Sequence, residues 1–146
     1  MPLLSQIEKT YHPERTEIRL EAAQQHRYLA QLYGYLARTT NQSSHYTPAV
    51  EHHKDSLRAL GVQLAEDSDV QGALPVLTTP QHEQEASLVS MLQIAQNTLC
   101  LGEEETARSW VNGAAWTHDV LYGGEKELFI MRAETWLREF GLMDLV

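Results

Sequence analysis

The feature that most constrains the fold is a long stretch with helical periodicity, from Pro13 to Arg38. Its apolar residues recur every three or four positions, which gathers them on one side of an α-helix. They are Ile18, Ala22, Leu29, Leu32, Tyr33 and Leu36. Such a stripe is too apolar to leave in water, so we expect other helices of the chain to cover it. The opposite side carries Arg19, Arg27, Gln31 and Arg38.

Four more helices are predicted from the same spacing and from start and stop signals. The second begins at Thr47-Pro48, a capping residue followed by a proline, and ends near Glu66. The others run from Thr79-Pro80 to Gly102, from the acidic cluster Glu103 to Glu105 as far as Gly123, and from Glu125 to about Phe140. Acidic residues favour helix starts, and glycines favour helix ends. No segment is a convincing strand.

These elements predict an all-α fold, a bundle of four to five helices, in one domain covering residues 1–146. Residues 67–79 join the second and third helices. This link of about a dozen residues is longer than helices of a bundle usually need, so it is able to cross the bundle. A crossover would make the two helices parallel, whereas a wide turn would make them antiparallel.

Charge and hydropathy exclude some kinds of partner. The formal net charge of -9 argues against nucleic acid, whose phosphates would be repelled, and is compatible with a basic protein partner. No apolar run is long enough for a membrane span, and the first residues lack the order of a signal peptide, so we expect a cytoplasmic protein.

The single cysteine, Cys100, has no partner within the chain for a disulfide.

The sequence contains none of the common phosphate-binding, zinc-protease, hydrolase or calcium-binding motifs. One set of polar residues remains on the predicted buried sides of three helices: His53, Glu85 and His118. Two histidines and a carboxylate inside a bundle form a ligand set for a divalent transition metal. The three side chains can meet only if the link at residues 67–79 crosses the bundle.

This arrangement resembles ferritin-like bundles in its helix count, its long middle link and the positions of two histidines. The resemblance implies a metal-binding four-helix bundle. Ferritin-like di-iron sites place a glutamate three residues before each histidine, and this chain has Val50 and Ala115 there. A full di-iron site is therefore not expected, and the hypothesis is a single metal ion with Tyr33 or Tyr35 level with His53.

Structural roles explain the same residues. His53 and His118 are more simply interpreted as buried histidines that bond to the backbone or to tyrosines, and Glu85 as an exposed acid that favours the helix start. A second histidine group, His45, His52 and His53 beside Glu51, suits either a surface ion or a solvated helix start.

Two functions follow as hypotheses. The first is a small acidic protein that binds another protein, as an adaptor, inhibitor, immunity factor or dedicated chaperone. Exposed aromatic residues such as Tyr28, Tyr35 and Trp116 would form its contact surface, and homodimer packing explains them equally well. The second is the metal-binding bundle. The sequence specifies neither the partner nor a substrate, and it leaves open whether the protein is an enzyme.

Overall fold

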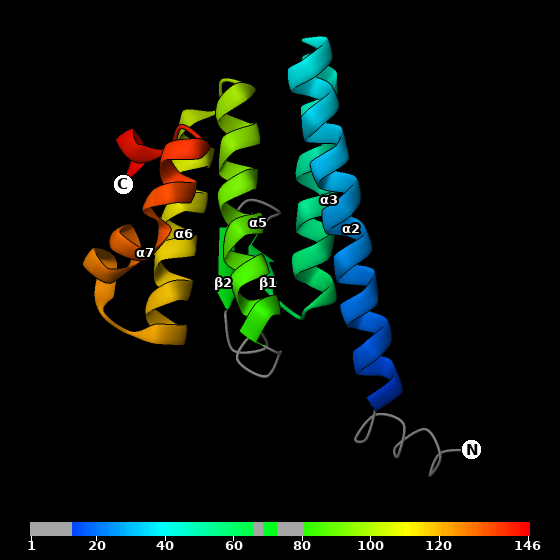
Figure 1. Ribbon diagram of the computed structural model, residues 1–146, viewed down its shortest axis with the longest axis vertical. Coiled ribbons are helices and arrows are strands. Elements are labelled where there is room, and N and C mark those ends of the chain that lie inside the picture. The colour runs from blue at the N-terminus through cyan, green and yellow to red at the C-terminus, as the bar shows by residue number, and fades with distance from the viewer. Residues whose placement is uncertain (1–12, 66–68, 73–80) are drawn as a thin grey trace.

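The computed structural model of the chain describes residues 13–65, 69–72 and 81–146 (Figure 1). Five α-helices lie in these ranges: α2 (Pro13–Thr40), α3 (Tyr46–Ala59), α5 (Gln81–Cys100), α6 (Glu104–Tyr122) and α7 (Glu125–Glu139). Two short 3-10 helices, η1 (Ser43–His45) and η2 (Met143–Leu145), precede α3 and follow α7. The predicted all-α bundle is confirmed.

The helices alternate in direction along the chain (Figure 1). α2 pairs with α3, α5 pairs with α6, and α3 packs beside α5, while α7 lies against α6. Because α5 starts at the end of the bundle where α3 finishes, these two helices are antiparallel (Figure 1). The connection between them is therefore a wide turn, which corrects the expected option of a crossover.

That connection contains a small antiparallel strand pair, β1 (Gln63–Ala65) and β2 (Asp69–Gly72), in which Leu64 lies opposite Val70. We expected helix as far as Glu66, and the helix stops earlier because of Gly61. This glycine has φ +86°, a left-handed conformation that glycine adopts without steric cost. The amide of Val62 then donates to the carbonyl of Leu57 at 3.0 Å, a standard helix C-terminal bond.

The connection between α2 and α3 is shorter than expected. We predicted a polar loop up to Tyr46, but only Asn41 and Gln42 separate α2 from η1, and α3 continues directly from η1. Asn41 takes a left-handed conformation with φ +57°, a common way to end a helix. Pro48 lies in the first turn of α3, where its missing N–H has no intrahelical partner to lose.

This tight connection sets which residues of α2 and α3 lie level. Arg19 Nε donates to the carbonyl of Ala59 at 3.0 Å, and Ser56 Oγ donates to the carbonyl of Ala23 at 2.9 Å. The expected register, with Tyr33 or Tyr35 level with His53, was wrong. It counted residues 43–45 as loop, whereas they add a helical turn before α3 and so shift the pairing.

The prediction was also wrong about which side of α2 is buried. Small residues line the buried side, together with Arg27: Ala23, Ala30, Gly34 and Ala37. Several members of the apolar stripe face outward instead, with Ile18 63%, Leu29 38% and Leu32 44% exposed. Small side chains allow α2 to approach its neighbours closely, which bulky leucines at the same positions would prevent.

The main hydrophobic cluster lies between α3, α5, α6 and α7, and among the described residues the buried alanines of α2 lie outside it. Trp110 and Phe129 are its largest fully buried side chains, and Leu142 and Leu145 close it beside η2. None of the described helices combines the length and the hydropathy that crossing a membrane requires.

Two substitutions within one turn of α2 test which side of this helix faces the interior. Ala30 is fully buried, so Ala30→Leu should overpack the contact and lower the free energy of unfolding by about 1–3 kcal/mol. Leu32→Ala should cost about 1 kcal/mol or less, because this side chain is already 44% exposed. Urea denaturation at low protein concentration measures both. The reverse ranking would mean that the predicted stripe faces the interior.

Candidate functional site

Two histidines face each other across the contact between α2 and α3. The Nδ1 atoms of His26 and His52 lie 3.1 Å apart, and the two rings stack with their centroids at 5.3 Å. One of these nitrogens carries a hydrogen and donates it to the other, because two bare lone pairs at this distance would repel. The pair is half-buried and results directly from the register of α2 and α3.

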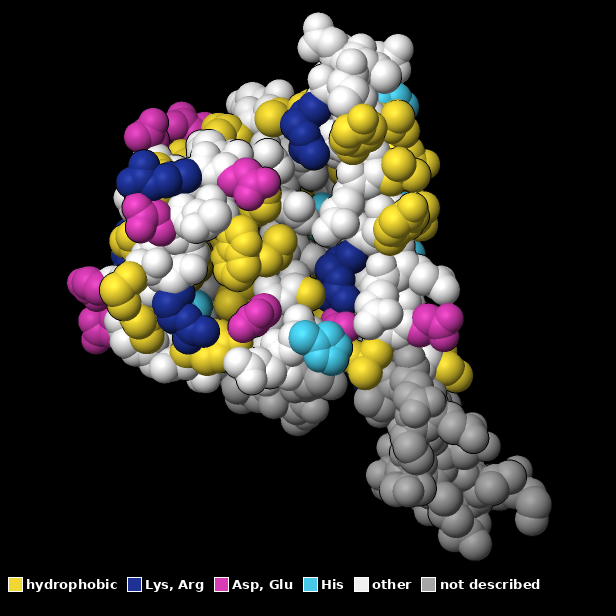
Figure 2. Space-filling view, viewed as in Figure 1, with side chains coloured by type: hydrophobic (Ala, Val, Ile, Leu, Met, Phe, Trp, Pro, Cys, Tyr) yellow, Lys and Arg dark blue, Asp and Glu magenta, His cyan; other side chains and the backbone are white. Residues whose placement is uncertain are grey.

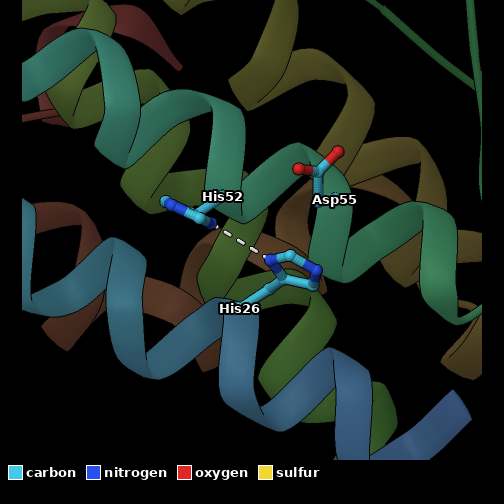
Figure 3. A group of neighbouring side chains, drawn as sticks. All are labelled: His26, His52 and Asp55. Atoms are coloured by element: carbon cyan, nitrogen blue, oxygen red, sulfur yellow. Dashed lines mark hydrogen bonds between the residues drawn. The ribbon is translucent and has the colours of Figure 1, made fainter.

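Asp55 completes a group of three metal-ligating side chains with these histidines. It lies three residues after His52, so the helix carries both on one side of α3 (Figure 3). One ligand atom from each of His26, His52 and Asp55 lies within 4.8 Å of the others. Within residues 13–65, 69–72 and 81–146, this is the one such group of three or more.

Neighbouring side chains hold this group in place. The ring of Tyr33 lies parallel to the ring of His52, with an interplanar angle of 8° and centroids 5.6 Å apart. His52 is thus stacked between Tyr33 and His26. On the other side, Arg58 Nη1 donates to Asp55 Oδ1 at 2.9 Å, which orients the carboxylate. Stacking and ion pairing both reduce the rotamer freedom of the potential ligands.

The predicted metal residue His53 lies elsewhere and is only 1% exposed. Burial lowers the pKa of His53 to about 3, assisted by the positive charge of nearby Arg27 and by His52. His53 is therefore neutral at physiological pH. Its Nδ1 atom is buried without a hydrogen-bond partner among the described residues.

Beside it, a buried ion pair connects α2 to α5. Arg27 Nη2 donates to Glu83 Oε2 at 2.6 Å, and Gln24 Nε2 donates to Glu83 Oε1 at 3.0 Å. Burial alone would raise the pKa of Glu83, but these hydrogen bonds and the charge of Arg27 lower it overall. The carboxylate is thus ionised at neutral pH, and it compensates the buried guanidinium of Arg27.

The other two predicted residues, Glu85 and His118, line one cavity between α5, α6 and α7. Its volume is about 150 Å³, a size that accommodates a benzene-sized molecule. Both ring nitrogens of His118 and the hydroxyl of Tyr122 are buried without a partner among the described residues. Burial, followed by the charge of Arg132, lowers the pKa of His118. The structure thus brings Glu85 and His118 together, while His53 does not line this cavity.

Sequence reasoning missed His26 and Asp55. His52 was considered, but only with its sequence neighbours Glu51 and His53. The signal that pairs it with His26 is the register of the two helices, which depends on counting residues 43–45 as helix. The spacing of His52 and Asp55 was visible in the sequence, since ligands three residues apart share one side of a helix.

The buried ion pair should be essential for stability. Glu83→Ala leaves Arg27 buried without its carboxylate, and we expect the free energy of unfolding to fall by about 3–5 kcal/mol. The double variant Arg27→Met/Glu83→Leu should recover most of this loss, because apolar side chains of similar size need no partner. Urea denaturation provides the measurement. A cost below about 1 kcal/mol for Glu83→Ala would contradict burial of the pair.

His53 should make the protein acid-sensitive. The unfolded chain protonates this residue near pH 6.5, whereas the native protein resists protonation down to about pH 3. Because the unfolded state binds more protons between these values, the free energy of unfolding falls as pH decreases through this window. The contribution lost between pH 7 and pH 5 is about 2 kcal/mol. His53→Gln should flatten this dependence in urea denaturation, and an unchanged pH dependence in this variant would contradict burial of a neutral His53.

Comparison of the chain with protein-family models, with curated proteins and with solved structures gave no match. The likeness to ferritin-like bundles therefore remains an analogy of architecture. A function for this chain must be inferred from the placement of its own residues.

Proposed function

We propose that this protein works by binding another protein, and that α2 carries the contact surface. The observation behind the proposal is the outer face of α2, which we define by Ile18, Tyr28, Leu29, Leu32 and Tyr35. All five side chains are exposed, with Tyr28 69% and Tyr35 59% accessible. Figure 2 shows hydrophobic side chains following α2 along the right edge of the molecule.

The size and the continuity of this face support binding. Single exposed apolar residues are common on protein surfaces, whereas a contiguous row of them marks an interaction site. Tyr28, Leu29, Leu32 and Tyr35 lie at helical spacing within about two turns, so these four are neighbours, whereas Ile18 lies about three turns closer to the start of α2. Two of them are tyrosines, which are enriched at protein interfaces because the ring is apolar and the hydroxyl can remain hydrated.

The chemistry of the outer face indicates what kind of partner fits. From Tyr28 to Ala37 the helix contains no charged residue, and Arg27, just before this segment, points inward to Glu83. An amphipathic helix of another protein matches both the apolar chemistry and the length of the face. The net charge of -9 favours a partner with basic residues beside its apolar stripe.

The partner at the outer face is either a different protein or a second copy of this chain, and an experiment must decide between them. A helix that pairs with its own copy would form a symmetric dimer, the commonest kind of oligomer. The overall negative charge disfavours this pairing, since two chains of charge -9 repel each other.

The proposal can be tested by placing a photo-crosslinking amino acid at Leu32 in the cells that produce the protein. We expect a discrete crosslinked species from this position and none from Met131, a 67% exposed residue of α7 outside the face. Mass spectrometry then distinguishes a different protein from a second copy. Absence of any crosslink at Leu32 and also at Tyr28 would overturn the proposal.

The identified species should then bind the purified protein in a manner that depends on the outer face. The double variant Leu29→Glu/Leu32→Glu should raise the Kd at least about a hundredfold, because each buried leucine contributes about 1.5–3 kcal/mol. Met131→Glu serves as the matched control and should leave the Kd unchanged. Equal Kd values for the double variant and the wild type would show that the contact lies elsewhere.

A further inference from the structure

We propose that His26, His52 and Asp55 form a binding site for a divalent first-row transition metal such as Zn²⁺. This site differs from the set predicted from the sequence and does not depend on the protein-binding proposal. Its ligands come from the contact between α2 and α3, and none of them belongs to the outer face of α2. The two proposals are tested at different residues and can therefore succeed or fail separately.

The distances suit a shared metal ion. Two nitrogens that each bind Zn²⁺ at about 2.0–2.1 Å in tetrahedral geometry lie about 3.3 Å apart. The Nδ1 atoms of His26 and His52 lie 3.1 Å apart, so a small outward movement of the rings would accommodate the ion. A carboxylate oxygen of Asp55 lies within 4.8 Å of one ring nitrogen of each histidine, and binding would require the Asp55 side chain to rotate toward them.

The chemistry of the three ligands selects the class of metal. Imidazole nitrogens favour zinc, copper, nickel, cobalt and iron, whereas Mg²⁺ and Ca²⁺ prefer oxygen ligands only. Three protein ligands leave at least one coordination position for water, as in exchangeable or catalytic sites rather than closed structural ones. On binding, the histidine whose Nδ1 carries the hydrogen shifts it to Nε2, so both Nδ1 lone pairs become available.

The surroundings keep the ligands near their binding positions. Tyr33 stacks on His52 and limits the positions of its ring, while Arg58 bonds to one oxygen of Asp55 at 2.9 Å and leaves the other for an ion. Hydrogen bonds from Arg19 and Ser56 to backbone carbonyls fix the register that brings His26 opposite His52. Such supporting contacts lower the entropic cost of ordering ligands around an ion.

The direct test is titration of the full chain with ZnCl₂ at pH 7.5, followed by calorimetry, after purification without a His tag and removal of metals with EDTA. We expect one Zn²⁺ per chain with a Kd in the micromolar range or below. His26→Ala and His52→Ala should each raise the Kd at least about tenfold. Asp55→Asn should also weaken binding, because it removes the anionic ligand.

The matched control is His45→Ala. His45 lies at the same contact, near Tyr33, but its Nε2 atom bonds to Gln42 and it does not belong to the group. The Kd of this variant should remain within about twofold of the wild type. His52→Phe is a second variant, whose ring can stack on Tyr33 but cannot bind a metal. It should weaken binding as His52→Ala does, which would show that the loss is not caused by a folding defect.

A second measurement uses the wild-type protein only. Long-range ¹⁵N NMR of the histidine rings should show the Nδ1 signals of two residues shifting together when Zn²⁺ is added. Co²⁺ substituted for Zn²⁺ should give the intense visible absorption of a four- or five-coordinate ion. The proposal is overturned if no Zn²⁺ binds at 100 µM, if the ligand variants bind as the wild type does, or if His45→Ala weakens binding equally.

Discussion

The close approach of α2 to α3 is the interaction on which the rest of the structure depends. Alanine and glycine on the inner side of α2 permit it, and the short connection through Asn41 and Gln42 sets its register. That register places His26 opposite His52, and the same seating of α2 directs Arg27 toward Glu83 of α5. It also turns Leu29, Leu32 and two tyrosines outward. The placement of α2 thus determines the histidine group and the apolar outer face, and together with α5 it forms the buried ion pair.

Two glutamates near the start of α5, Glu83 and Glu85, lie in different surroundings. Glu83 faces α2, where its hydrogen bonds and ion pair are complete, while Glu85, two residues later, lines the cavity beside His118. Residues two apart on a helix point in different directions, so each carboxylate serves a different side of α5. The Glu83 site has a structural role, and within it Arg27 Nη1 is buried without a partner among the described residues. His118 and Tyr122 also have polar atoms without a partner in the described part of the chain, and their cavity has room for water or a small ligand.

Much of the fold could be predicted from the sequence because helix signals are local. Five helices were expected, and the ends of α5, α6 and α7 agree with glycines at positions 102, 123 and 141. The orientation of α2 could not be predicted from periodicity, because its leucine stripe and its alanine side repeat at the same period, and only packing decides which faces inward. The grouping of His53, Glu85 and His118 depended on connectivity and register. A helical turn at residues 43–45 and the early end of α3 at Gly61 altered both.

The absence of α2 residues from the hydrophobic core cluster has a thermodynamic consequence. Alanines, hydrogen bonds to α3 and α5 and the ion pair with Glu83 hold this helix, so polar contacts and close packing replace the large apolar side chains of the core helices. Both the outer face and His26 are carried on this helix. A metal ion bound between α2 and α3 would therefore also hold in place the helix that carries the outer face.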